Sequence, residues 1–192
     1  MKKGFTLIEL LVVIAILAVL ATAVVLVLNP AELLKEGRDS TRVSDLAALN
    51  SAISLWVQDV QDTTANWPAV NTYNCTYAAT LPTAGVAGCT INSVTTVNST
   101  AGWVPINFTL ITSGSPLARL PIDPANGSAT CSKGAPGVCE YAFAASSTVG
   151  IYEIDAQLES AKFNAGGGSH MTDKDGGNDP NWYEMGSNLS LF

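Results

Sequence analysis

One ionisable side chain, Glu9, lies inside the apolar run that extends from Phe5 to Leu28. An acid inside a membrane-spanning helix costs about 2.5 to 3.5 kcal/mol, so we expect it to have a function and a positively charged partner. No basic residue lies between Gly4 and Leu28. Cleavage of the chain just before Phe5 would create an α-amine one helical turn from Glu9. Glu9 would then lie in the first turn of the helix, where the macrodipole favours negative charge.

The apolar run is long enough to cross a membrane. Its 24 residues would form a helix of about 36 Å, compared with a hydrocarbon core of roughly 30 Å. A secretory signal peptide instead has an apolar stretch of about 7 to 15 residues, followed by a cleavage site of small residues. Lys2 and Lys3 precede the run and should stay on the cytoplasmic side. We therefore expect a single span followed by an exported C-terminal part.

The residues around Glu9 resemble a known processing motif. The stretch KKGFTLIEL (residues 2–10), followed by LVVIAIL, closely resembles the N-terminal methylation motif of type IV pilins and type II secretion pseudopilins. The resemblance implies cleavage between Gly4 and Phe5 by a prepilin peptidase and methylation of the Phe5 amine. It further implies that Glu9 pairs with the N-terminal amine of a neighbouring subunit, with the apolar helix as the filament core.

The resemblance also implies partners and a location. The partners would be further copies of the chain in a helical filament, the prepilin peptidase, an inner-membrane assembly platform and, for the precursor, the membrane itself. The precursor would lie in the inner (cytoplasmic) membrane, and the filament would be extracellular or periplasmic. The alternative is an ordinary signal anchor with a stray glutamate, which the insertion cost of Glu9 disfavours.

Length and composition divide the chain into four segments. We expect a prepilin leader at residues 1–4, a transmembrane and filament-core helix at 5–28, an amphipathic half of the helix at 29–60, and one exported globular head at 61–192. The formal net charge is −7. An acidic chain with few Lys and Arg lacks the electrostatic footprint of a nucleic-acid-binding protein. We therefore expect no nucleic acid among its partners.

The four cysteines all lie in the part expected to be exported, where an oxidising compartment permits disulfides. They are Cys75, Cys89, Cys131 and Cys139. Sequence alone allows three pairings. We favour Cys75 with Cys89 and Cys131 with Cys139, because each pair flanks a short loop that closure would rigidify. A zinc site is the alternative, but the spacings do not match those of zinc ligands.

Residues 31–60 carry the apolar pattern of an amphipathic helix. Five apolar residues recur at spacings of three and four: Leu46, Leu49, Ile53, Trp56 and Val60. We expect this stripe to pack on a sheet, and Pro30 to kink or locally break the helix before it. The opposite face carries charged residues, among which Arg42 can pair with Asp39 or Asp45 at a spacing of three.

The rest of the chain predicts a small antiparallel sheet. Residues 61–102 have the composition of an irregular, disulfide-closed loop. Val104 to Ile111 alternates as a half-buried strand does, and Glu140–Ala144 with Gly150–Leu158 reads as a hairpin. Trp182–Leu191 adds a final strand. One long helix followed by a small antiparallel sheet predicts an α+β, pilin-like fold.

A glycine-rich loop, residues 166–181, concentrates hard oxygen donors of the kind that calcium prefers. They are Asp173, Asp175, Asn178 and Asp179. The spacing is not that of an EF-hand. Related pseudopilins carry a C-terminal calcium loop, although with another order of ligands. Calcium is therefore the one candidate cofactor, and a solvated loop without a metal is the alternative.

Motifs of catalytic sites do not occur in the sequence. It has a single histidine, no G-x-S-x-G nucleophile elbow and no glycine-rich phosphate loop, so we expect no enzymatic activity. The sequence predicts a structural subunit of a type IV pilus-like filament. Two alternatives stay open: a type II secretion pseudopilin that forms a short periplasmic pseudopilus, and a monomeric, membrane-anchored surface binding module.

Overall fold

The computed structural model describes most of the chain in two compact units. The described residues are 4–60, 66–68, 70–77, 89–98, 100–131, 137–164 and 166–192. The first unit is Met1–Lys35 and the second is Glu36–Phe192. The boundary lies inside the segment 29–60, which was expected to form one amphipathic half of the helix.

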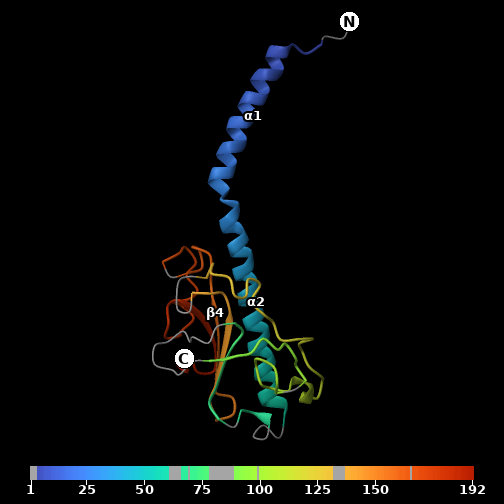
Figure 1. Ribbon diagram of the computed structural model, residues 1–192, viewed down its shortest axis with the longest axis vertical. Helices are drawn as coiled ribbons and strands as arrows, with labels where there is room; N and C mark the ends of the chain where they lie inside the picture. The colour runs from blue at the N-terminus through green and yellow to red at the C-terminus, as the bar shows by residue number, and fades with distance from the viewer. Residues whose placement is uncertain are drawn as a thin grey trace. The chain divides into compact units, whose positions relative to one another are not determined.

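The first unit contains α1 (Leu7–Leu28) and the beginning of α2 (Pro30–Asp59) (Figure 1). Asn29 separates the two helices with a left-handed backbone, φ 40°, a conformation that Asn tolerates better than most residues. Pro30 then begins α2, where its missing N–H is not needed for a helical hydrogen bond. The backbone thus leaves the helical conformation at Asn29, directly before the proline at which the sequence predicted a kink or a local break.

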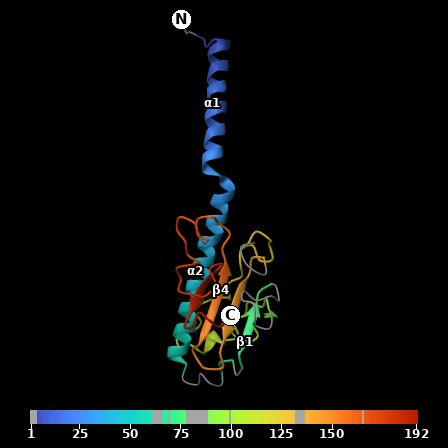
Figure 2. The same cartoon turned by 90° about the vertical axis from the view of Figure 1, so that its left-hand side faces the viewer.

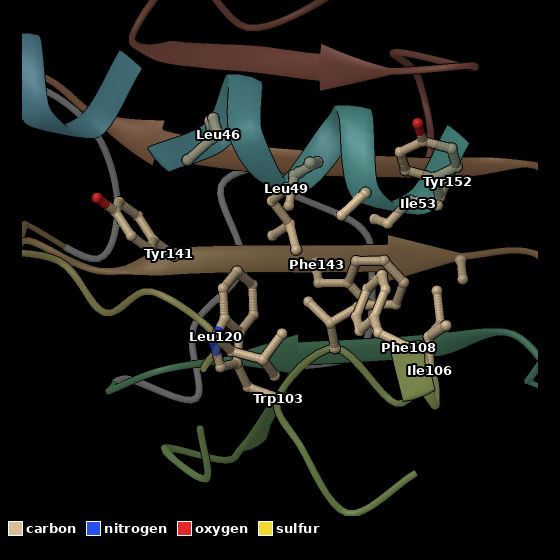
Figure 3. Packing of buried hydrophobic residues seen from close by; sticks show 14 of the residues in the cluster. Leu46, Leu49, Ile53, Trp103, Ile106, Phe108, Leu120, Tyr141, Phe143 and Tyr152 are labelled. Carbon is tan, nitrogen blue, oxygen red and sulfur yellow. The ribbon is translucent and has the colours of Figure 1, made fainter. Parts of the chain in front are cut away.

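In the second unit, α2 packs its apolar stripe against the sheet (Figure 3). Leu46, Leu49, Ile53 and Trp56 are fully buried, and Val60 packs against the same core. These are the residues whose spacing predicted the helix. Burial of such a stripe is what stabilises an amphipathic helix, since helix propensity alone contributes little.

The sheet has five strands in the order β2-β1-β3-β4-β5. Their bounds are β1 (Thr72–Cys75), β2 (Thr90–Ile91), β3 (Tyr141–Ala145), β4 (Tyr152–Gln157) and β5 (Trp182–Gly186). All neighbours are antiparallel except β1 and β2, which are parallel. Figure 2 shows α2 alongside β4, which lies between β3 and the edge strand β5. The predicted hairpin, the final strand and the α+β, pilin-like fold class are confirmed.

The two faces of the sheet have different surroundings. Tyr141 and Phe143 of β3 belong to the core that includes the stripe of α2. Ala142 and Ala144 point to the other face and pack in a smaller cluster with Trp182. This alternation follows from the pleat of a strand, whose successive side chains point to opposite faces.

The strand predicted at Val104–Ile111 is wrong. This segment contains a short 3-10 helix, η1 (Phe108–Leu110), and no strand. The side chain of Asn107 accepts a hydrogen bond from the Thr109 amide, and so provides a local partner that competes with strand pairing. The apolar residues Ile106 and Phe108 are nevertheless buried, so burial was predicted and the backbone conformation was not.

The segment 61–102 is more ordered than the loop predicted from its composition. It supplies β1 and β2 to the sheet, while residues 61–65, 69, 78–88 and 99 lie outside the described residues. A disulfide joins Cys75 at the end of β1 to Cys89, and a second joins Cys131 to Cys139. This is the pairing favoured from the sequence.

We predict that Leu49→Ala lowers the free energy of unfolding of the head by about 2–5 kcal/mol, because it leaves a cavity in the core. The matched control is Leu55→Ala on the same helix, where the side chain is 40% exposed and the change should stay within about 0.5 kcal/mol. Denaturant unfolding followed by tryptophan fluorescence measures both, since all four tryptophans are buried in the second unit. Equal losses in the two variants would contradict the assigned packing.

Candidate functional site

The N-terminus of α1 holds Glu9 in a capping box with Thr6. Thr6 donates its backbone N–H and its hydroxyl to Glu9 Oε2, at 2.8 and 2.6 Å, and the Thr6 hydroxyl oxygen accepts the Glu9 amide at 3.3 Å. Two groups at the helix start are thereby satisfied reciprocally. The carboxylate of Glu9 is thus directed back towards the helix start rather than along the apolar surface.

The bond expected to be cleaved, Gly4–Phe5, lies before this cap. Gly4 and Phe5 have no helical or strand structure, and the Phe5 side chain is 84% exposed. Apart from its neighbours in the chain, no described atom lies within 4 Å of the position that a Cβ on Gly4 would occupy. The bond is therefore open to a protease, and the residue that would become the new N-terminus lies next to the N-cap residue Thr6.

The rest of α1 is apolar on every side. The described large side chains of α1, which exclude Leu26, are 47% exposed or more, and they lie all round the helix. Among the described residues, one helical stretch that includes α1 is long and apolar enough to cross a membrane. A helix that is apolar all round belongs in lipid or in a protein core. This surface and the N-terminal carboxylate form the candidate functional site.

The N-terminal residues match a known family model. Residues 1–25 match the model of the prokaryotic N-terminal methylation motif. This is the type IV pilin and pseudopilin signature. The motif implies processing by a prepilin peptidase and assembly into pilus-type filaments. Together with the apolar helix it fits a membrane-anchored precursor. The family that it marks consists of structural pilin subunits rather than enzymes.

The match to the family model covers the N-terminal segment of the chain. No curated protein and no solved structure matches the chain. The pilin signature therefore describes the N-terminal segment, and the head must be interpreted from its own contacts.

In the head of this pilin-like chain, Arg42 is buried among three carboxylates. Its guanidinium donates to Asp123 through Nε and Nη2, at 2.6 and 2.8 Å. It also donates to Asp39 at 2.7 Å and to Glu159 at 2.6 Å. Arg38 adds a two-pronged contact to Glu159. The network ties α2 to the loop before β3 and to the residues after β4.

The positions of Asp39 and Arg42 differ from the sequence-based expectation. Both were placed on the charged face opposite the apolar stripe, and both are fully buried. Of the two pairs considered, Arg42 with Asp39 is formed, while Asp45 instead accepts a hydrogen bond from Tyr141. The sequence spacing could reveal only the local pair, because the other two partners of Arg42 lie 81 and 117 residues away.

The four loop residues predicted to bind calcium have separate partners. Asp173 lies 3.2 Å from His170, and the side chain of Asn178 donates to the Phe192 carbonyl. Asp175 accepts from the amides of Gly177 and Glu184, and Asp179 accepts from Asn181. Among the described residues, the loop acids do not form a cluster of close ligand atoms.

A different set of acids does come together beneath this loop. Glu153 and Asp155 of β4 and Glu184 of β5 place carboxylate oxygens within 4.8 Å of one another. Burial raises the pKa of Glu153 to about 7 and that of Glu184 to about 8, and it raises the pKa of Asp155 well above its ordinary value. Sequence analysis missed this cluster, because alternating acids in a strand usually face water.

We predict a pH-dependent effect of Glu159→Gln. Burial alone would raise the pKa of Glu159, but hydrogen bonds from Arg38 and Arg42 lower it from 4.5 to about 2. The charged carboxylate therefore stabilises the fold above about pH 4.5, and this stabilisation disappears as the pH falls through about 2. The melting temperature of the variant should lie well below that of the wild type at pH 7, and the difference should vanish near pH 2.

The control for this prediction is Glu36→Gln, which removes a more exposed pair with Lys162. It should change the melting temperature little at either pH, since surface pairs contribute about 0 to 1 kcal/mol. Thermal unfolding followed by circular dichroism measures both variants. A difference between wild type and Glu159→Gln that is the same at pH 7 and pH 2 would contradict the ion-pair role.

Proposed function

We propose that this chain is a structural subunit of a type IV pilus-like filament. It is cleaved after Gly4, methylated on the amine of Phe5 and polymerised through its apolar N-terminal helix. The observation that carries the proposal is the combination of the methylation motif at residues 1–25 with a helix whose apolar side chains are exposed on all sides.

The apolar surface of α1 supports self-assembly on physical grounds. Each buried CH₂ group contributes about 0.8 kcal/mol, so a helix of this composition is costly to leave in water. In the precursor the hydrocarbon of the membrane covers it. Once the subunit leaves the bilayer, other apolar surfaces must replace the lipid. In a filament, the identical helices of neighbouring subunits would bury this apolar surface.

The capping geometry supports the role given to Glu9. In the precursor, Glu9 Oε2 accepts two hydrogen bonds from Thr6. Cleavage would place a charged amine on Phe5, directly before Thr6, so the helix start would carry both the carboxylate and a free cation. A cation and an anion in a medium of low dielectric attract strongly. Pairing of Glu9 with the amine of an adjacent subunit would then set the axial register of the two helices.

The type II secretion pseudopilin is the nearest alternative, and a monomeric surface binding module is the alternative of another class. A pseudopilin shares the processing and polymerisation steps and differs in forming a short periplasmic assembly. The monomeric module requires neither cleavage nor oligomers. Mass spectrometry of the mature chain distinguishes a processed filament subunit from the monomeric module. We expect a chain that begins at Phe5 and carries one added methyl group. A chain that still begins at Met1 would overturn the proposal.

We predict that Glu9→Ala leaves membrane insertion intact and lowers incorporation into filaments. The loss of a pair worth about 1.4 kcal/mol or more changes an association equilibrium by about tenfold or more. The assay compares the membrane fraction with sheared surface filaments by immunoblotting, and electron microscopy of the same material distinguishes long pili from a short pseudopilus.

The matched control is Glu32→Ala, which neutralises a carboxylate that pairs with Lys35 at the start of α2, outside the apolar run. Its incorporation should equal that of the wild type. If Glu9→Ala assembled as well as Glu32→Ala, the pairing role of Glu9 would be refuted.

A further inference from the structure

Asp155 is the buried charged group for which the fold offers no partner. Its side chain lies on β4, between β3 and β5, and is fully buried. Neither carboxylate oxygen has a hydrogen-bond partner among the described residues. A buried carboxylate without a partner is strongly destabilising, so native proteins pair such groups or use them to coordinate metals.

Two acids near Asp155, Glu153 and Glu184, each have one buried carboxylate oxygen without a partner among the described residues. Glu153 uses Oε2 to accept the amides of Leu191 and Phe192, at 2.6 and 3.3 Å, and its Oε1 is buried without a partner. Glu184 uses Oε1 to accept the Asp179 amide at 3.2 Å, and its Oε2 is buried without a partner. The backbone contacts therefore orient both side chains and leave one free oxygen on each.

The sheet register places these charges where they repel. Asp155 of β4 lies directly opposite Glu184 of β5, and like charges in this arrangement are destabilising. Asp175 and Asp179 in the covering loop add further negative charge around Asp155. Among the ion pairs of the described residues, none includes Glu153, Asp155 or Glu184. The cluster must therefore take up protons or bind a cation, and a cation also supplies a partner for the free oxygens.

We propose that Glu153, Asp155 and Glu184 bind one calcium ion. Their ligand oxygens lie within 4.8 Å of one another, close enough for one ion with the flexible coordination and ligand distances of about 2.3 to 2.6 Å that calcium accepts. Magnesium demands near-ideal octahedral geometry and keeps several of its waters, which a buried set of three carboxylates does not favour. Carboxylates are hard oxygen ligands and contain no sulfur or imidazole that would favour zinc or copper.

The covering loop is shaped to leave room for these carboxylates. A Cβ on Gly177 would lie 1.0 Å from Glu184 Oε2, so no other residue fits at this position without displacing the ligand. The loop acids Asp175 and Asp179 contribute charge rather than the close ligand set. The ligands proposed here are thus strand side chains beneath the loop, and they differ from the loop residues that the sequence suggested.

A bound ion would join elements that are distant in sequence. It would connect β4 to β5 directly, and through the amide contacts of Glu153 it would fix the last two residues of the chain to the sheet. The C-terminal third of the head would therefore gain stability with calcium. This inference is independent of cleavage and filament assembly.

The test uses the full-length chain in detergent, first stripped with EGTA and then titrated with calcium chloride. We expect one calcium per chain by calorimetry. We also expect the melting temperature to rise by roughly 5 to 10 °C when free calcium is about 100 times the dissociation constant. This titration uses the wild-type chain, so its outcome does not depend on whether a variant folds. Absence of binding would overturn the proposal, and equal stabilisation by magnesium chloride would overturn the assignment to calcium.

Two variants locate the ion. Asp155→Asn should bind calcium at least about 100-fold more weakly, since it loses its central ligand. Without calcium it should melt at or above the wild type, because a repulsion is removed. The control Asp173→Asn changes an exposed loop acid paired with His170 and should bind as the wild type does. If Asp155→Asn does not fold, Glu184→Gln replaces it. Wild-type affinity in the folded ligand variant would refute the site.

Discussion

The apolar surface of α1 is the constraint on which the function of this protein depends. Within the described chain, its side chains have solvent around them from Leu7 to Leu28, and such a surface is not stable in water. In the proposed function, lipid covers it in the precursor and neighbouring helices cover it in the filament. The one acid near its start, Glu9, is held by Thr6, at the position where cleavage would create an amine. Under this proposal, membrane insertion and assembly use the same surface in turn.

The head contains two clusters of buried ionisable side chains with different surroundings. Arg42 is fully buried, but three carboxylates surround its guanidinium at 2.6 to 2.8 Å, so the desolvation cost is offset by well-aligned charged hydrogen bonds. The acids of β4 and β5 have no such counterpart. Side chains of the described residues neutralise the first cluster, whereas we propose that a cation completes the second. The contrast is the reason for assigning an ion to the second cluster and not to the first.

Periodic patterns were the part of the fold that sequence could predict. The stripe from Leu46 to Trp56 predicted its helix and its buried face, and the alternation around Phe143 predicted a strand. The alternation at Val104–Ile111 wrongly predicted a strand. The side chain of Asn107 accepts a hydrogen bond from the Thr109 amide, and the chain forms η1 at this point. The polar composition of residues 61–102 concealed β1, since a strand of four residues carries too little pattern to be recognised.

The N-terminal segment is determined by the sequence alone, because its motif, its length and its single acid act through local spacing along one helix. The head is different. Glu153 and Asp155 are ordinary polar positions of an alternating strand until the pairing of β4 with β5 places Glu184 opposite Asp155 and Gly177 packs against the Glu184 carboxylate. Likewise, Arg42 finds Asp123 and Glu159 only after the chain has folded. Contacts between residues distant in the chain depend on strand register and loop packing, and those are decided by the tertiary structure.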